Sequence, residues 1–357
     1  MNNLQLILAF ITAFSVVLLA TPSLIKVAKL KQLVDEPSEE RKKHTTSIPT
    51  IGGIIIFSAF IFSIFLWFPD ENYKAIEALS QFMYLAASLV LLFFVGVKDD
   101  IIGMSPIKKL MAHIMVGFIL VVMGGIKITS FQGLLGLDFI LPDYASILLS
   151  IFIYIVIVNS INLIDGVDGL APGIGLIITF TFGVWFTNSG DIHWALVSFA
   201  LAGALLGFLV FNFNPARIFM GDSGSLIIGA VVSVLAIQLI QTPLDFLPVD
   251  FQNLSTPVFA MSILSYPLLD TLRVFIIRAA QGRSPLSADR NHLHHKLMDK
   301  QLGAKRTVLI IYLFNTIMIV QAFFFRFDNP NISFVISLSL ALIFALVIYM
   351  IAKKTKG

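Results

Sequence analysis

Five clusters of polar residues interrupt a chain that is otherwise strongly apolar, and their residue types suit metal and phosphate chemistry. The clusters are Asp99-Asp100, the run 159–168, Asn212, the run 219–222 and the run 292–295. The 357-residue chain is 57% hydrophobic and only 13% charged. Ionisable residues within membrane segments are costly and usually functional. We therefore expect these clusters to form a site for polar or charged ligands.

The adjacent acids Asp99 and Asp100 follow an apolar run and precede the bases Lys108 and Lys109. Carboxylates can share a metal ion with substrate phosphates, and lysine binds phosphate as a point charge. A solvated helix end is the alternative interpretation. The pair alone does not decide between the two.

The run from Asn159 to Asp168 places a polar residue at every third position, namely Asn159, Asn162, Asp165 and Asp168. On a helix, this spacing keeps side chains near one face. Two amides and two carboxylates would be costly to leave unpaired in lipid, so we expect this face to hold a polar ligand. Hydrogen bonding between helices is the alternative.

Asp222 lies in the run 219–225, which superficially matches the Gly-Asp-Ser-Gly pattern of serine proteases. That chemistry needs histidine and aspartate partners on a different fold. The carboxylate is instead a hard oxygen ligand that suits Mg²⁺, with Mn²⁺ as the alternative ion. The main-chain amides at 223–225, which open the next apolar run, could hold an anion.

Three histidines, His292, His294 and His295, close a basic loop that also contains Arg290. This density suggests zinc, but a tetrahedral zinc site needs further ligands that the other histidines are badly placed to supply. Contacts to phosphate or to a leaving group are favoured, because Arg290 adds paired donors that match phosphate. A solvated polar loop is the remaining alternative.

The elements that position these clusters are expected to be membrane-spanning helices, because stretches of about 18–20 mostly apolar residues recur from end to end. The mean hydropathy of +0.92 agrees with this. We predict an all-α polytopic integral membrane protein that forms one domain, residues 1–357. The eleven predicted spans are 4–25, 51–68, 81–97, 107–124, 145–162, 172–187, 193–211, 224–241, 257–278, 307–325 and 332–352.

Positive charge predicts the orientation of these spans. With the N-terminus outside and the C-terminus in the cytoplasm, 21 of the 24 lysines and arginines lie in cytoplasmic segments, as the positive-inside rule requires. All five polar clusters then lie at the cytoplasmic face. The chain has no cysteine, which excludes disulfides and thiolate chemistry. Its pI near 9.0 gives no specific indication of nucleic acid binding.

In this order, the clusters closely resemble the signature of the polyprenyl-phosphate N-acetylhexosamine-1-phosphate transferases, the superfamily of WecA, TagO and MraY in glycosyltransferase family 4. The resemblance covers nearly the whole chain and implies a phosphotransferase with its active site at the cytoplasmic face. The matching patterns are Asp99-Asp100, Asn-x-x-Asn-x-x-Asp-Gly-Val-Asp-Gly-Leu at 159–170, Phe-Met-Gly-Asp-Ser-Gly-Ser at 219–225, His-Leu-His-His at 292–295, and His44 with Pro-Thr-Ile-Gly-Gly at 49–53.

The resemblance also implies roles for single residues. Asp222 would bind Mg²⁺, and Asp99 and Asp100 would engage the lipid phosphate, one of them as a general base. Asp168 and Phe219 would hold the uracil. The implied catalytic residues are Asp99, Asp100, Asp165, His294 and His295, and the implied substrate-binding residues are His44, Asn159, Asn162, Asp168, Lys108, Asn212, Phe219, His292 and Arg290.

The implied reaction transfers a sugar-1-phosphate from a UDP-activated N-acetyl amino sugar to undecaprenyl phosphate and releases UMP. It would be the first membrane step of a cell-envelope polysaccharide, such as O-antigen or teichoic acid, in the inner membrane of a bacterium. His-Leu-His-His and the loop 48–53 resemble the WecA/TagO branch, which favours UDP-N-acetylglucosamine. Another UDP-N-acetyl amino sugar, or the UDP-MurNAc-pentapeptide donor of MraY, is the alternative.

Some alternatives stay open at this point. Direct attack by the lipid phosphate is preferred, and a covalent aspartyl-phosphate route is the other option. A membrane transporter is the rival from another class, but transporters need polar groups near the midplane, whereas these acids gather at one face. Membrane lipids are expected partners, and a homodimer is plausible, although no helix shows a convincing seam of small residues.

Overall fold

The apolar runs form long helices in the computed structural model, which describes residues 2–31, 34–35, 48–68, 74–243, 247, 249–282, 292–298, 302–327 and 329–353. Between α1 and α2, β1 (Val34–Asp35) pairs antiparallel with β2 (Ile48–Pro49). The π-helical turn η1 (Ile119–Met123) continues α4, and η2 (Leu134–Gly136) is a 3₁₀ turn. The α-helices are α1 (Asn2–Leu30), α2 (Gly52–Trp67), α3 (Lys74–Ile102), α4 (Pro106–Phe118), α5 (Asp143–Leu163), α6 (Leu170–Asn188), α7 (Ile192–Asn212), α8 (Asp222–Ile240), α9 (Val249–Gln252), α10 (Thr256–Ile263), α11 (Ser265–Ala280), α12 (Leu293–Leu297), α13 (Gly303–Phe324) and α14 (Pro330–Lys353).

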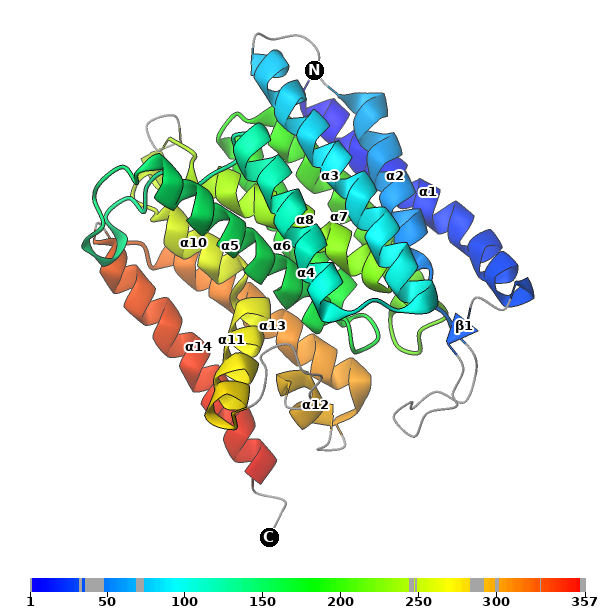
Figure 1. The fold of residues 1–357 in the computed structure, drawn as a ribbon. Coiled ribbons are helices and arrows are strands. Elements are labelled where there is room, and N and C mark those ends of the chain that lie inside the picture. Colours follow the sequence, from blue (N-terminus) through cyan, green and yellow to red (C-terminus); the bar gives the residue numbers. More distant parts are fainter. Residues whose placement is uncertain are drawn as a thin grey trace.

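Helix α8 lies at the centre of the bundle, where it contacts α2, α3, α5, α6 and α10 (Figure 1). Its best apolar window is 89% buried, whereas that of the peripheral α14 is 17% buried. A helix that is apolar on all sides is stable only when other elements enclose it. The helix that begins with Asp222 is therefore held on several sides at once.

Nine of the described helices are long and apolar enough to cross a membrane. The chain is an all-α, multi-pass membrane protein. The predicted spans 51–68 and 257–278 differ from this set, because α2 has only 16 residues and the α10–α11 pair is bent by 77°. The prediction of a continuous helix over 257–278 was wrong. Pro267, in the first turn of α11, cannot donate a main-chain hydrogen bond, and its ring crowds the carbonyl four residues earlier. The count of eleven crossings stays a prediction.

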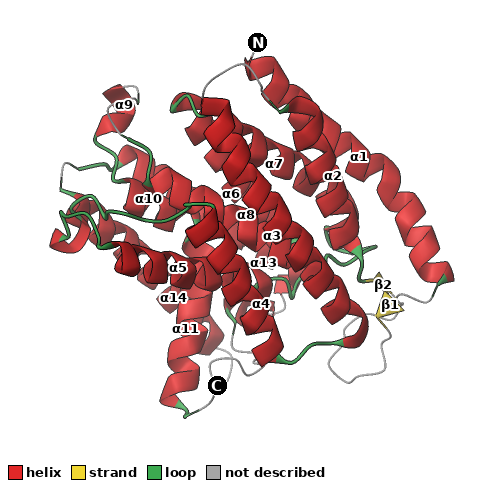
Figure 2. Cartoon of the chain, turned by 45° about the horizontal axis from the view of Figure 1, so that its top comes forward, coloured by secondary structure: helices red, strands yellow, loops and turns green. Residues whose placement is uncertain are grey.

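The two ends of the chain lie at opposite ends of the bundle (Figures 1 and 2). The membrane topology stays a prediction. In Figure 2, the strands β1 and β2 lie at the same end of the bundle as the end of α3 and the start of α4. The polar clusters of the sequence are concentrated at this end.

Helix α7 packs on α1 through two glycines. A methyl group added at Gly203 would lie 2.2 Å from the carbonyl oxygen of Phe10, and one added at Gly207 would lie 2.8 Å from that of Phe14. The expectation that no helix has a seam of small residues was therefore wrong, since these glycines, four residues apart, bring two main chains into contact. The seam is used within the chain. The homodimer stays a prediction.

Two more glycines bring α2 and α3 against the first turn of α8. A methyl group at Gly53 would lie 2.2 Å from the main-chain nitrogen of Gly224, and one at Gly96 would lie 2.4 Å from the Cα of Ser223. No other residue type allows such an approach. Main-chain contact between three helices thus fixes the start of α8, where the site lies.

Candidate active site

Asp100, in the last turn of α3, binds the N-terminus of α8. Its Oδ1 accepts a hydrogen bond from the main-chain N–H of Asp222 at 2.7 Å, and its Oδ2 accepts one from that of Ser223 at 3.1 Å. The first amides of a helix lack partners within the helix and favour a negative charge. Of the amides at 223–225 that were expected to hold an anion, only that of Ser223 binds the Asp100 carboxylate, whereas those of Gly224 and Ser225 donate to the carbonyl of Gly221.

Gly221 permits this contact. Its φ of 72° lies in the left-handed region, and a methyl group there would lie 2.7 Å from both carboxylate oxygens of Asp100. Glycine adopts this conformation without steric cost. The glycine that precedes α8 therefore permits the close approach of α3.

Asp222 lies at the centre of a second set of contacts. Lys109, from α4, forms ion pairs with Asp222 and with Asp99, the latter at 2.8 Å. The amide of Asn162, from α5, donates to Asp222 Oδ1 at 2.7 Å and to Ser225 Oγ at 2.8 Å. We call Asp99, Lys109, Asn162 and Asp222 the acid cluster. Its three charged side chains are between 16% and 25% exposed, so a ligand can reach them.

Asp165, in the turn after α5, adds to the negative charge near this cluster. Burial raises the pKa of its carboxyl well above the usual range, and Asp222, Asp100 and Asp168 raise it further. Acids whose pKa values are shifted by burial and by neighbouring charges are typical of functional sites.

Asp168 and Asn212 join the two loops that border the acid cluster. Asp168 Oδ2 accepts hydrogen bonds from the side chain of Asn214 at 2.9 Å and from the main chain of Ala216 at 3.0 Å. Asn212, in turn, accepts from the main chain of Gly169 at 2.9 Å and donates to that of Ile218 at 2.8 Å. Both residues therefore shape the loops, whatever contact they make with substrate.

Phe219 is fixed by its main chain. Its N–H donates to the carbonyl of Pro49 at 2.7 Å, and its carbonyl accepts from Gly52 at 2.9 Å. Gly53 donates to the carbonyl of Met220 at 2.9 Å. The Pro-Thr-Ile-Gly-Gly motif is thus the partner of the loop before α8, and the half-buried ring of Phe219 can vary without breaking these bonds.

The histidines gather at α12 and lie against the turn that follows α5. A methyl group at Gly166 would lie 3.7 Å from Nε2 of His294 and 3.8 Å from Cε1 of His295. Burial lowers the pKa of His294 to about 3, against the opposing effect of Asp270. The structure thus brings the motif 292–295 next to the motif 159–170.

The remaining predicted residues are not in these contacts. Asn159 donates to the carbonyl of Ile155 in its own helix at 2.8 Å, and Lys108 is exposed. His44 and Arg290 lie outside the described residues. Their roles stay predictions.

Comparison of the sequence with known proteins identifies the family of this chain. Residues 82–240 match the family described as glycosyl transferase family 4. The decaprenyl-phosphate N-acetylglucosaminephosphotransferase of Mycobacterium tuberculosis (strain CDC 1551 / Oshkosh) is 34% identical, over 92% of this chain and 84% of its own length. The chain belongs to the polyprenyl-phosphate N-acetylhexosamine-1-phosphate transferases.

Other relatives of the transferase agree with this assignment. The probable undecaprenyl-phosphate N-acetylglucosaminyl 1-phosphate transferase of Bacillus subtilis (strain 168) is 30% identical, over 97% of this chain and 90% of the relative. The undecaprenyl-phosphate alpha-N-acetylglucosaminyl 1-phosphate transferase of Escherichia coli (strain K12) is 29% identical, over 81% and 75%. The chain is therefore a sugar-phosphate transferase.

The acid cluster of the transferase fits a hard divalent cation. The carboxylates of Asp99 and Asp222 already converge on one cationic group, the ammonium of Lys109. Oxygen donors of this kind, shared with substrate phosphates, are what Mg²⁺ prefers. In the described part of the chain, ligand atoms of Asp270, His292 and His294 also lie within 4.8 Å of one another, but Asp270 and His292 are hydrogen-bonded to each other.

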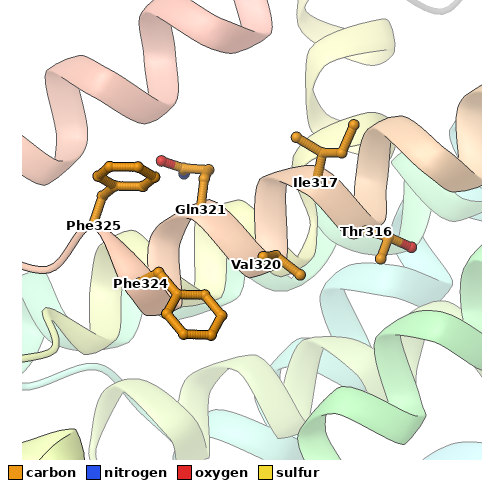
Figure 3. A pocket seen from close by; sticks show the side chains of 6 residues that line it. All are labelled: Thr316, Ile317, Val320, Gln321, Phe324 and Phe325. Atoms are coloured by element: carbon orange, nitrogen blue, oxygen red, sulfur yellow. The ribbon is translucent and has the colours of Figure 1, made fainter.

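The pocket in Figure 3 is not part of this site. Its lining side chains come from the second half of α13 and the residue that follows it, at the opposite end of that helix from α12. The lining is mostly apolar, and it includes no residue of the acid cluster. A lipid-facing hollow is sufficient to account for it.

Two residues of these contacts, Lys109 and Asp270, were not among the predicted site residues. Lys109, rather than Lys108, faces α8, because Lys109, His113 and Val116 follow helical spacing and turn inward together. That spacing was a readable signal. Asp270 is an acid within the apolar stretch 257–278, and such an acid is by itself reason to look for a partner.

Replacing Asp165 with asparagine should raise the melting temperature of the transferase by about 2 °C or more at pH 7.5. The carboxyl binds its proton more tightly in the folded chain, so its ionisation lowers stability at any pH above the folded pKa. The penalty shrinks as the pH falls toward the unfolded value near 3.9. Melting curves at pH 7.5 and pH 5 should show the gain decreasing on acidification, while turnover falls. A variant less stable than wild type at pH 7.5 would contradict this account.

Proposed function

We propose that the transferase moves N-acetylglucosamine-1-phosphate from UDP-N-acetylglucosamine to undecaprenyl phosphate, with UMP as the second product. The observation that carries the proposal is the convergence of Asp99, Lys109, Asn162 and Asp222 from four helices at one end of the bundle. Paired acids beside a lysine suit a reaction in which two anionic phosphates must meet. We propose that this reaction takes place at the cytoplasmic face of a bacterial inner membrane and is the first membrane step in the synthesis of a cell-envelope polysaccharide.

The reaction is a direct transfer in this proposal. An oxygen of the lipid phosphate attacks the phosphorus that carries the sugar, a new P–O bond forms, and the bond from that phosphorus to the bridging oxygen breaks. The electron pair leaves with UMP. Both oxygens of Asp100 are engaged by the amides of α8, which argues against Asp100 as the nucleophile of a covalent aspartyl route.

The acidic and the basic residues of the site have different roles in this proposal. Asp99 and Asp222 would hold Mg²⁺, which neutralises phosphate charge in such reactions. Lys109 lies between the same acids and can pair with a phosphate once a metal holds them. His294 and His295 lie beside Gly166, and together with His292 they would contact the donor phosphates or the leaving group. Asn162 keeps Asp222 in position.

A donor and acceptor panel tests the proposal. Purified transferase would be incubated with Mg²⁺, either undecaprenyl or decaprenyl phosphate, and UDP-sugars that include UDP-N-acetylglucosamine, UDP-N-acetylgalactosamine and UDP-MurNAc-pentapeptide. UMP release and the mass of the lipid product are the readouts. Release of UMP with UDP-N-acetylglucosamine supports the proposal. Release only with another donor would support the same type of reaction but assign the transferase to a different pathway. No release with any donor, from folded protein, would overturn it.

Replacing Phe219 with alanine should raise the KM for the UDP-sugar about 10-fold, because stacking on a base contributes about 1–3 kcal/mol. The main-chain bonds of Phe219 to Pro49 and Gly52 do not depend on the ring, so the loop should persist. Phe219→Tyr keeps an aromatic face and should retain a near-normal KM. An unchanged donor KM in Phe219→Ala would remove the uracil assignment.

A further inference from the structure

Asp270 is an acid in α11, within the apolar stretch 257–278, and its side chain is fully buried. Both of its oxygens are engaged by the start of α12. Oδ2 lies 2.7 Å from Nδ1 of His292, and Oδ1 accepts the main-chain N–H of Leu293 at 2.7 Å. A carboxylate in an apolar segment is stable only with partners of this kind. Asp270 therefore joins α11 to the histidine motif.

A second residue on the same face of α11 supports the next histidine. Tyr266 lies one helical turn before Asp270, and its hydroxyl lies 3.1 Å from Nδ1 of His294. The rings of His292 and His294 are stacked, with centroids 5.1 Å apart and an angle of 11° between them. Residues four apart on a helix lie side by side. One face of α11 thus sets the positions of two histidines.

The partner of Nδ1 decides what His292 can offer to a substrate. A carboxylate accepts, so the ring carries a proton on Nδ1, and only Nε2 is left for other contacts. A carboxylate at this position also stabilises the ring when it carries a positive charge. Both effects suit a histidine that faces anionic phosphates.

We infer that Asp270 is a positioning residue for the transfer reaction, which it serves by fixing the tautomer and orientation of His292. The inference rests on the proposed function, since His292 would act on the phosphates of the donor. The hydrogen bond at 2.7 Å, the complete burial of the carboxylate and its second bond to Leu293 carry it. Asp270 itself touches no substrate.

The substitution Asp270→Asn separates positioning from folding. Asparagine has the same shape, and its carbonyl oxygen can still accept from Leu293. Its amide, however, presents N–H to Nδ1 of His292 and moves the ring proton to Nε2. We expect kcat to fall about 100-fold, with the donor KM changed by less than about threefold.

The neighbouring residue provides a matched control. Thr271 is buried on the same helix, and its hydroxyl has no hydrogen-bond partner among the described residues. Thr271→Val has the same shape and should keep wild-type kcat and melting temperature. Asp270→Asn should also melt close to wild type. Equal losses of activity in the two variants would assign the effect to packing and overturn the inference.

A double-mutant cycle tests the route through His292. In a His292→Ala background, Asp270→Asn should lower kcat by less than about twofold more, since its target is already gone. Losses that multiply would mean that Asp270 acts elsewhere. If the wild type releases no UMP with any donor, the proposed function fails. If it is active and Asp270→Asn is equally active, only the inference fails.

Nitrogen-15 spectra of histidine-labelled protein give a readout that does not need activity. The His292 signals are assigned by their loss in His292→Ala. In the wild type, Nδ1 should carry the proton, and in Asp270→Asn the proton should move to Nε2. An unchanged tautomer in the variant would overturn the inference even if activity fell.

Discussion

Replacing Asp222 with alanine is expected to lower kcat/KM more than about 1,000-fold, the loss typical when a group that stabilises transferring phosphates is removed. Asp222 contacts Lys109 and Asn162 at once, and it opens α8. Its loss would therefore remove a metal ligand and release the lysine from one of its two acids. Initial rates over a Mg²⁺ titration are the measurement.

Two variants make this result specific. Asp222→Asn keeps the shape and should need more Mg²⁺ for half-maximal rate. Asp138→Asn changes an exposed acid in the loop before α5 and should behave as wild type. An Asp222→Ala protein with full activity would remove the metal assignment.

Replacing Asp100 with alanine should lower activity about as far as Asp222→Ala and should also destabilise the protein by about 3 kcal/mol, since each hydrogen bond to a charged group contributes about 1.5–3 kcal/mol. The amides of Asp222 and Ser223 would lose their acceptor at the boundary of a central helix. Thermal unfolding and initial rates measured on one preparation check both effects.

The neighbouring acid provides the contrast. Asp99 makes a partly exposed ion pair with Lys109, and pairs of this kind add little stability. Asp99→Ala should therefore lose activity but melt near the wild-type temperature, whereas Asp100→Ala should melt well below it. The opposite order would mean that Asp99, and not Asp100, holds α8.

Apolar runs were enough to predict most helices and their ends. The predicted span 145–162 became α5 (Asp143–Leu163), and 193–211 became α7 (Ile192–Asn212). Polar or glycine-containing turns bound these runs, so length and hydropathy decide their limits. The bend at Leu264 was missed because both halves of the run are apolar. Pro267 indicated a break in the helix, but hydropathy alone does not take proline into account.

The candidate site was predictable in its residue types but not in its pairings. Acids and histidines at one face could be recognised, because lipid excludes them elsewhere. The partner of Asp100 could not be predicted from the sequence. Asp100 binds main-chain N–H groups at 222–223, and every residue except proline has such a group. Choosing Lys109 over Lys108 required knowing which face of α4 is turned toward α8. Asp270 was recognisable as an isolated acid, but its link to His292 required the fold.

The glycine contacts around α8 have a consequence for genetics. At Gly53 and Gly96, an added methyl group meets main-chain atoms of Gly224 and Ser223. At Gly183, by contrast, it meets only the ring of Phe199, at 2.8 Å. A defect at Gly183 can be relieved by a smaller residue at 199, so second-site revertants should arise there. Trimming a side chain does not relieve a clash with main-chain atoms, so selection for restored activity in Gly53 or Gly96 variants should return true revertants.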